Sequence, residues 1–410
     1  MSAGAGRARP DLAVGTVAAK SYLPFARVLA RSFRERHPQV PFFLLLADEP
    51  QGCFDPAAEP FEMIRLADVG IPRLRRFLFQ YTRREVAVAL KANLLGHLLE
   101  RGFRRALFLD ADVWVTGDLV PLFAALERSA ILLTPHLLAP LDGPAAARRE
   151  LAIVRAGSLN AGLVGVADDP DARRFLGWWQ ERLATHCRLA PRQGLHHDQG
   201  WLALVAGGFR GVEIVRDPGA NVAYWNLAER GLDLVDGEPR VQGQTVRFLH
   251  FSGFDPDRPE RLTRHSSEPA PPRPAAAVEL CRRYAEALAA AGWRESRSWP
   301  YAYGKFDDGS AIPEVARSLY RGLGEGAEAF GDPFATAAAG CFADWLVPSD
   351  ARALARTPLW AALLERRPDV RAVFPDPAGA DRGGFLRWAR SSGAREHGLA
   401  ARFLPAPPAQ

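Results

Sequence analysis

The sequence predicts an α/β protein with a mainly parallel sheet flanked by helices, followed by a helical C-terminal region. Two observations predict this architecture. In the first two thirds of the chain, short apolar stretches alternate with amphipathic stretches at helical spacing, which is typical of a parallel sheet covered by helices. Beyond a Pro-rich stretch at 266–276, the remaining apolar residues recur mainly at helical intervals.

Each expected element follows from its own apolar pattern. Continuous or alternating apolar runs predict strands at 11–22, 40–48, 61–69, 106–110, 129–138, 159–167, 212–218 and 245–254. Apolar residues in phase on one face predict helices at 21–37, 81–103, 173–187, 278–293, 313–321, 334–346, 350–366 and 383–391.

The expected domain organisation has three parts. Residues 1–265 form a catalytic domain, and the polar, Pro-rich stretch 266–276 (SSEPAPPRPAA) is a linker. Residues 277–410 form a mainly helical extension. No internal repeat divides the chain further.

Composition excludes several classes of protein. Hydrophobic residues make up 48% and charged residues 24% of 410 residues, as in soluble globular proteins. No apolar run is long enough to span a membrane, and the start MSAGAGRARPDL lacks the apolar segment of a secretory signal. We therefore expect a cytoplasmic protein without a transmembrane segment.

Charge and cysteine usage exclude two further kinds of function. The net charge is +5, but no basic run with interleaved aromatic residues is present, which argues against nucleic-acid binding. The four cysteines are far apart in sequence and show no CxxC spacing. We expect free, buried thiols rather than disulfides or a zinc site.

The strongest candidate site is a pair of aspartates in LFLDADVWV (107–115). Asp110 and Asp112 lie where the expected strand 106–110 ends, and ligands bind at the carboxyl ends of parallel strands. Residues i and i+2 of an extended chain point to the same side, so the two carboxylates repel each other unless a cation lies between them. Mg²⁺ or Mn²⁺ is the natural partner. The alternative is one aspartate that caps the next turn and one that is solvated.

One enzyme class with such a pair is the haloacid-dehalogenase phosphatases, which the chain resembles loosely. There the first aspartate attacks phosphate and the second is the general acid and base, beside Mg²⁺. ILLTP (131–135) and VADDP (166–170) are similar to the later motifs of that family. However, the family's pair usually follows the first strand and continues with Gly-Thr, whereas here it lies at position 110 and continues with Val-Trp.

A second resemblance covers residues 11–255. LKANLLGHLLERGFRRALFLDADVWVTGDL (90–119), LNAGLVG (159–165), HHDQGWL (196–202) and HFSG (250–253) are similar, in the same order, to motifs of glycosyltransferase family 8, which includes glycogenin, galactinol synthase and bacterial lipopolysaccharide glycosyltransferases. The resemblance implies a GT-A fold and metal-dependent, retaining transfer of a hexose from a nucleotide-sugar donor, with UDP-sugar as the first candidate. The C-terminal third has no counterpart in that family.

The resemblance also implies roles for individual residues. The implied metal ligands are Asp110, Asp112 and His250. The donor-binding residues are Thr16, Ala18, Tyr22, Lys91, Asp110, Ala111 and Gly253, and Asp198, Gln199 and Asn160 lie near the reacting sugar. His197 and the aromatic residues of YWNL (224–227) are secondary candidates for sugar contacts.

Structural alternatives exist for several of these residues. His250 can be a packed histidine at a strand end, Lys91 a solvated helix residue, and Asp198 the N-cap of a helix over GWLALV. The family's pattern has a lysine where this chain has Pro256, and Arg258, Arg261 or Arg264 can replace it.

The resemblance does not identify the substrates. The acceptor can be a glycan, a lipid-linked glycan, a protein or a small molecule. The sequence also allows a homo-oligomer. A non-catalytic scaffold that binds sugar nucleotides is the third functional class to consider.

Overall fold

The computed structural model describes residues 11–265, 274–348 and 353–405, which divide into two compact units. The first unit contains Met1–Ile71 and Ala87–Tyr301, and the second contains Pro72–Val86 and Ala302–Gln410. The division therefore falls at Tyr301, and the second unit includes a segment from the first quarter of the chain. Most of the expected linker, 266–273 of 266–276, lies outside the described residues.

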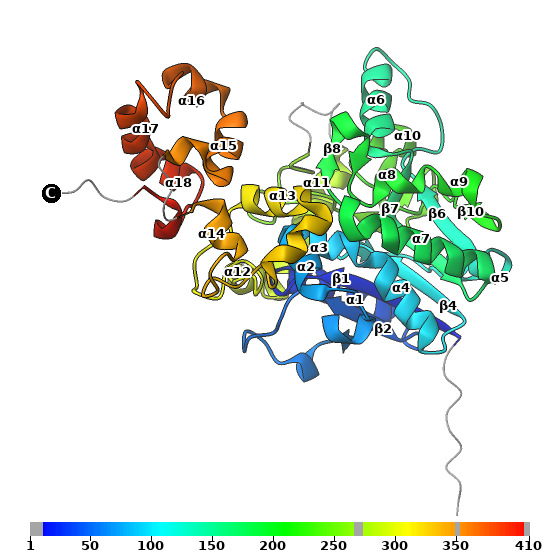
Figure 1. Cartoon of the computed structure of the whole chain (residues 1–410). Helices are drawn as coiled ribbons and strands as arrows, with labels where there is room; N and C mark the ends of the chain where they lie inside the picture. The colour runs from blue at the N-terminus through cyan, green and yellow to red at the C-terminus, as the bar shows by residue number, and fades with distance from the viewer. Residues whose placement is uncertain (1–10, 266–273, 349–352, 406–410) are drawn as a thin grey trace, which may run out of the picture. The chain divides into compact units, whose positions relative to one another are not determined.

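The first unit is built on a seven-stranded sheet with the strand order β10-β6-β7-β4-β1-β2-β3 (Figure 1). All pairs are parallel except those of β7, which runs antiparallel to both β4 and β6. This confirms the predicted, mainly parallel sheet. The strands are β1 (Leu12–Ala18), β2 (Phe42–Leu46), β3 (Glu62–Ile64), β4 (Arg105–Leu109), β6 (Ile131–Pro135), β7 (Leu159–Ala167) and β10 (Val212–Ile214).

Smaller strand pairs lie outside this sheet. The pair of most consequence joins β5 (Val113–Val115) and β14 (Phe248–His250) in antiparallel register. The others are β8 (Leu189–Ala190) with β9 (Leu195–His196), and β11 (Leu232–Val235) with β12 (Glu238–Val241) and β13 (Gln244–Thr245). The expected strand 245–254 is thus two short strands.

Helices cover both faces of the large sheet. Leu12 and Val14 of β1 pack in one core cluster with residues of α1, whereas Gly15 faces Leu94 of α4. The helices of this unit are α1 (Leu23–Arg36), α4 (Lys91–Glu100), α5 (Val120–Arg128), α6 (Ala146–Ala156), α7 (Pro170–His186), α8 (Gln199–Leu202), α9 (Val205–Gly208), α10 (Leu227–Arg230), α11 (Ala275–Ala290) and α12 (Trp293–Ser296).

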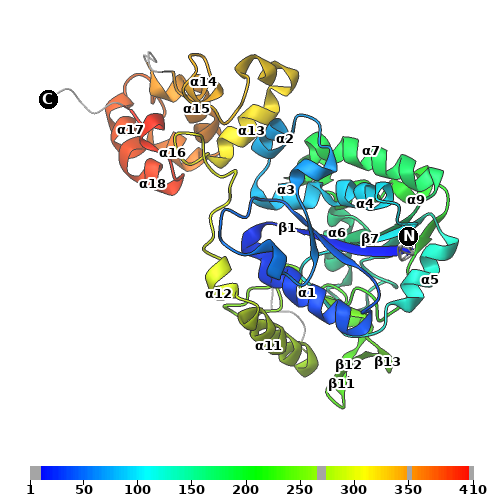
Figure 2. The ribbon, with the colours of Figure 1, turned by 90° about the horizontal axis from the view of Figure 1, so that it is seen from below.

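Helix α11 belongs to the core of the first unit, although it follows the Pro-rich stretch. It lies beside α1 (Figure 2). Its residues Leu280, Tyr284 and Leu288 are at most 2% exposed and share the core cluster with Phe25 of α1. The Tyr284 ring stacks on Phe251 with 3.9 Å between ring centroids. The helical region beyond residue 276 therefore contributes structure directly to the sheet-containing unit.

The expected helix 81–103 is divided in two. The structure has α3 (Arg83–Ala89) and α4, which begins at Lys91 after Leu90 as its N-cap residue. The division of the chain into units also passes through α3, because Val86 belongs to the second unit and Ala87 to the first. Apolar periodicity continues across Leu90, so the pattern alone does not reveal the break.

The second unit is helical, as expected for the C-terminal region. It contains α2 (Leu74–Gln80), the first part of α3, α13 (Glu314–Gly322), α14 (Phe342–Leu346), α15 (Pro358–Glu365), α16 (Pro368–Val373), α17 (Arg382–Trp388) and α18 (Ala394–Glu396). The Phe79 ring of α2 contacts Phe306, Tyr320, Phe334 and Phe342. The buried Arg317 guanidinium of α13 donates hydrogen bonds to the carbonyls of Leu78, Phe79 and Tyr81.

Two further expectations concern membranes and cysteines. Among the described residues, no helix combines the length and the apolar character that a membrane crossing needs. Cys53, Cys187, Cys281 and Cys341 form no disulfides, and the last three are buried.

Candidate functional site

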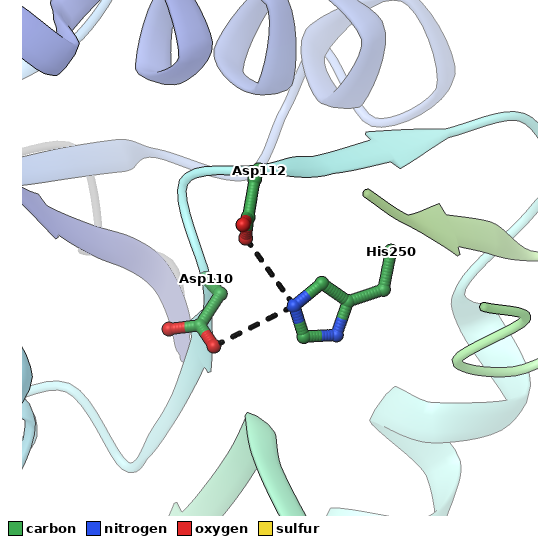
Figure 3. Close-up of side chains that lie close together, drawn as sticks. All are labelled: Asp110, Asp112 and His250. Atoms are coloured by element: carbon green, nitrogen blue, oxygen red, sulfur yellow. Dashed lines mark ion pairs between the residues drawn. The ribbon is translucent and has the colours of Figure 1, made fainter. Parts of the chain in front are cut away.

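Asp110, Asp112 and His250 bring three potential metal-ligand atoms together at one edge of the large sheet (Figure 3). One ligand atom from each residue lies within 4.8 Å of the other two. The His250 Nε2 atom is 3.2 Å from Oδ1 of Asp112 and 3.7 Å from Oδ2 of Asp110. The structure thus groups the three residues that the sequence singles out as metal ligands.

The strands around the site place these side chains. Asp110 follows the carboxyl end of β4, and its N–H donates to the carbonyl of Gly162 on the antiparallel neighbour β7. Asp112 precedes β5, which pairs with β14 so that His250 lies opposite Val113. A Cβ atom at Gly162 would collide with the His250 ring. Gly162 of the LNAGLVG segment therefore lets His250 approach the end of β4.

Electrostatics separate the two carboxylates. Burial raises the pKa of Asp110, and the nearby charges of Lys91 and His250 only partly offset that effect. Burial also acts to raise the pKa of Asp112. The charge and the hydrogen bond of His250 outweigh burial, so the pKa of Asp112 lies below its usual value. Two close carboxylates of this kind favour a cation between them.

Lys91 connects the aspartate pair to Asp198. Its Nζ atom lies 2.8 Å from Oδ1 of Asp110 and 2.9 Å from Oδ2 of Asp198, and it donates to the Ala161 carbonyl at 3.0 Å. Burial acts to lower the pKa of the ammonium, but the two carboxylates outweigh burial and raise it. Lys91 is 3% exposed, so it is not a solvated helix residue.

Asp198 lies at the N-cap position of α8, but its side chain makes no capping hydrogen bond. Its carboxylate is 5% exposed and pairs with Lys91 instead. The carboxylate is therefore held by Lys91, beside Asp110, and does not cap the helix.

Asn160 and Gln199 are joined by their side-chain amides. The Asn160 Nδ2 group donates to Oε1 of Gln199 at 3.0 Å and lies 3.2 Å from Nε2 of His136. The Gln199 Nε2 group donates to the Ala156 carbonyl at 2.8 Å. Much of the hydrogen-bonding capacity of both amides is thus used inside the protein.

Four residues expected to bind the donor lie on β1, shortly after β1, or after β4. Thr16, Ala18 and Ala111 are buried, and the Thr16 Oγ1 atom has no hydrogen-bond partner among the described residues. The Tyr22 ring is stacked on Phe25, with 3.9 Å between centroids and parallel planes. Small residues therefore line the end of β1, and Tyr22 has one face already packed.

Gly253 adopts the left-handed conformation, with φ at 69°. A Cβ atom there would collide with the His265 ring and would lie 2.8 Å from Oγ1 of Thr263. The Gly253 carbonyl accepts hydrogen bonds from the Arg264 backbone N–H at 2.9 Å and from its Nε–H at 3.4 Å. Of the three arginines considered for the position of Pro256, Arg264 therefore binds Gly253 through its side chain.

Three residues near the site were not identified from the sequence. Asn221 contacts His250, and His136 contacts Asn160. Burial, together with the charge of Asp112, raises the pKa of Tyr284 on α11. His136 directly follows β6, at the same sheet edge as Asp110, but the expected strand 129–138 placed it inside a strand and so hid this signal. Asn221 lies in a loop, and Tyr284 lies beyond the Pro-rich stretch. Neither residue type gives a comparable signal in the sequence.

The acidic pair of the phosphatase motif lies elsewhere. Asp168 and Asp169 follow the end of β7, which is antiparallel to β4, and Ala167 pairs with Arg105 at the start of β4. Asp110 follows the other end of β4, so the length of the strand separates the two acidic groups.

Comparison with known proteins gives distant similarities. No protein-family model matches the chain. It is 25% identical to two uncharacterized proteins of Bacillus subtilis (strain 168): YfnF over 249 residues, 58% of this chain and 80% of YfnF, and YfnD over 200 residues, 48% of this chain and 62% of YfnD. The second match thus spans less than two thirds of its relative.

The chain is also similar to solved structures of glycosyltransferases. The galactosyltransferase LgtC, in complex with donor and acceptor sugar analogs, is 15% identical with a TM-score of 0.42, and the match covers 69% of this chain and 99% of LgtC. The glycosyltransferase GlyE of Streptococcus pneumoniae TIGR4 is 14% identical with a TM-score of 0.38, covering 72% and 67% respectively. Similarities of this size do not assign a family, and the functional inference therefore rests on the site.

Proposed function

We propose that this protein is a metal-dependent glycosyltransferase of the GT-A type. It would transfer a sugar, with retention of anomeric configuration, from a nucleotide diphosphate donor to an acceptor hydroxyl, and UDP-sugar is the leading donor candidate. One observation carries the proposal: Asp110, Asp112 and His250 converge at the carboxyl edge of a mainly parallel sheet, next to the Lys91–Asp198 ion pair.

The three residues fit a divalent ion. They offer two carboxylates and one imidazole nitrogen, which suits Mn²⁺ or Mg²⁺ better than a softer metal. The Asp110 carboxylate can serve the ion and Lys91 together, because Oδ1 faces the ammonium and Oδ2 faces His250. When bound, such an ion would neutralise the donor pyrophosphate and stabilise the departing nucleotide diphosphate.

The protein's own charges would orient the donor. The buried Lys91 ammonium holds Asp110 and Asp198 in fixed positions on its two sides. Asp198 would then lie near the anomeric carbon, where a carboxylate stabilises the positive charge of an oxocarbenium-like transition state. Asn160 and Gln199 would border the same space, with their amides held by internal hydrogen bonds.

Arg264 is our candidate for the cation that replaces the family's lysine at the position of Pro256. Its backbone and side chain both bind the carbonyl of Gly253, whose left-handed conformation allows a close backbone approach. An Arg guanidinium there would contact a phosphate in a bidentate manner.

The alternatives have less support. A phosphatase of the haloacid-dehalogenase type would need its second acidic pair near Asp110, but Asp168 and Asp169 lie at the opposite end of the strand. A non-catalytic scaffold would have no use for the buried Lys91–Asp198 pair beside the metal-ligand group, because buried charges are expensive to maintain.

A donor screen tests the proposal. Purified protein is incubated with UDP- and GDP-sugars and either Mn²⁺ or Mg²⁺, and released nucleotide diphosphate is measured. We expect release from one donor that disappears with EDTA. Release of inorganic phosphate from phosphorylated compounds, without any nucleotide diphosphate, would instead support the phosphatase. Glycans, lipid-linked glycans, proteins and small sugars are then compared as acceptors.

A further inference from the structure

Asn221 places a buried amide against the ring of His250. It lies in the loop between β10 and α10, is 0% exposed and adopts the left-handed conformation with φ at 57°. Its Oδ1 atom is 3.0 Å from Nδ1 of His250. A strained backbone conformation at a buried position beside a candidate site is a reason to look for a functional role.

The orientation of the Asn221 amide follows from a backbone group. The Gly162 N–H donates to Oδ1 of Asn160 at 2.9 Å, and a backbone N–H can only donate. The Asn160 atom in this contact is therefore its oxygen. That oxygen also lies 3.1 Å from the Asn221 amide, so the Asn221 atom facing it must be the nitrogen.

The proton position on His250 follows in turn. With Nδ2 of Asn221 directed at Asn160 and at Oγ1 of Thr134, the Asn221 atom that faces the His250 ring is an oxygen acceptor. The Nδ1 atom of His250 must then carry a proton. The opposite nitrogen, Nε2, faces the carboxylates of Asp110 and Asp112, where either a second proton or a metal ion can lie.

Asn226 holds the loop that carries this amide. Its Nδ2 group donates to the Asn221 carbonyl at 2.9 Å, and its Oδ1 atom accepts from the Ala223 N–H at 2.9 Å. The left-handed conformation favours Asn, Asp or Gly over other residues. Glycine lacks the acceptor, and aspartate would place a second oxygen against Oδ1 of Asn160. Asparagine is the residue that satisfies both the backbone and all these contacts.

We propose that Asn221 is a positioning residue that keeps the His250 proton on Nδ1 and so leaves the Nε2 lone pair free for a divalent metal ion. This inference rests on the proposed metal site. Metal-binding histidines generally donate their other ring N–H to an outer partner, and losing such a partner typically lowers metal affinity by about 10- to 100-fold.

The first measurement uses the wild-type chain. Long-range ¹H–¹⁵N correlation spectra of ¹⁵N-histidine-labelled protein report the protonation of each ring nitrogen, and His250 is assigned by comparison with His250→Gln. We expect a protonated Nδ1 and an unprotonated Nε2 in the Mg²⁺-loaded protein. A proton on Nε2 with Nδ1 unprotonated would overturn the inference without any variant.

The second measurement compares variants. Asn221→Gly keeps the left-handed backbone but removes the acceptor, and we expect mixed tautomers at His250 and a loss of Mn²⁺ affinity of about 10- to 100-fold by calorimetry. Asn221→Asp retains an acceptor and should retain the Nδ1–H tautomer. Asp236→Gly is the matched control, because Asp236 is an exposed residue with φ at 53° in the turn between β11 and β12.

The outcomes separate this inference from the proposed function. Unchanged tautomer and Mn²⁺ affinity in a folded Asn221→Gly variant would overturn the role of Asn221. Mn²⁺ binding that depends on Asn221, in a protein that binds no nucleotide, would uphold the inference and overturn only the glycosyltransferase proposal. A wild-type protein without Mn²⁺ binding would overturn both.

Discussion

The ammonium of Lys91 lies 2.8 Å from the Asp110 carboxylate, inside the first unit and almost out of contact with solvent. The same ammonium holds Asp198 at 2.9 Å. One buried cation therefore pairs with carboxylates from two different motifs. This contact links the strand-end aspartates to the HHDQGWL segment and makes Lys91 a member of the site.

Replacement of Lys91 should therefore cost stability as well as function. Lys91→Met leaves the buried Asp198 carboxylate and the partly exposed Asp110 carboxylate without their cation, and breaking a buried ion pair typically costs about 3–5 kcal/mol. We expect a loss of that order in the free energy of unfolding, measured by urea denaturation. Lys305→Met is the matched control, because Lys305 is exposed. Equal stability of Lys91→Met and wild type would contradict the neutralising role.

Asp112→Asn should impair metal binding without unfolding the protein. The change removes a charged ligand but keeps the size of a side chain that is 15% exposed. We expect Mn²⁺ affinity to fall by at least the roughly 10- to 100-fold that loss of an outer-shell partner causes. Metal-dependent donor turnover should fall with it. Asp142→Asn, at an exposed position, should leave both unchanged. Normal turnover by folded Asp112→Asn would make the aspartate pair structural.

Nucleotide binding should require the metal ion. Isothermal titration with UDP and GDP, each with and without Mn²⁺, should show binding of UDP only when Mn²⁺ is present. The physical reason is that Asp110 and Asp112 would repel a pyrophosphate in the absence of a cation between them. Binding of both nucleotides with equal affinity in EDTA would contradict the proposal of a metal-dependent UDP-sugar donor.

His136 should make stability depend on pH in mildly acidic solution. Burial lowers the pKa of His136 from 6.5 to about 4. Because the folded pKa lies below the unfolded one, the unfolded state binds the proton more tightly. The contribution to stability is complete above pH 6.5 and falls by about 1.4 kcal/mol per pH unit as the pH drops toward 4.

The variant His136→Gln isolates this effect. Urea denaturation of wild type and variant between pH 4 and 7.5 should give stability curves that converge as the pH falls, because the variant lacks the titrating group. Parallel curves over this range would show that His136 titrates normally in the folded state.

The two units predict different outcomes for two truncations. A chain ending at residue 273 lacks α11 and with it Leu280, Tyr284 and Leu288, which are buried in the core of the first unit. Loss of such large core side chains costs several kcal/mol each, so we expect aggregation. A chain ending at Tyr301 retains α11 and should keep the core of the sheet-containing unit. Both chains leave Phe79 without its aromatic partners beyond Tyr301, so the decisive result is that of the shorter chain: soluble, folded protein from the chain ending at residue 273 would refute the role given to α11.

Several parts of the site were predictable because they follow directly from strand ends. Asp110 and Asp112 come after an apolar run, and the carboxyl ends of parallel strands meet at one edge of a sheet. His250 was placed by its motif. The LNAGLVG segment was identified too, but only the structure shows that the absence of a Cβ atom at Gly162 allows the His250 ring to approach. Local pattern and motif order suffice for such residues.

Other parts were not predictable because they depend on tertiary contacts between distant segments. Asn221 contacts His250 across 29 positions of sequence, from a loop with no periodic signal. Tyr284 lies on a helix that follows the Pro-rich stretch, and such a stretch predicts a separate extension rather than a part of the sheet-containing unit. The break at Leu90 has no signature either, because apolar periodicity continues through it. In each case packing decides the outcome rather than local propensity.

The membership of residues 72–86 in the second unit also bears on the order in which the chain can fold during synthesis. The ribosome releases Phe77, Leu78 and Phe79 early, but the aromatic partners of Phe79 begin at Phe306 and extend to Phe342. At a translation rate of about 5–20 residues per second, on the order of 10 to 50 s pass before the partners of these apolar side chains are synthesised. During that interval the apolar side chains of residues 72–86 lack their packing partners and can aggregate. A chaperone that binds this segment would raise the yield of native protein.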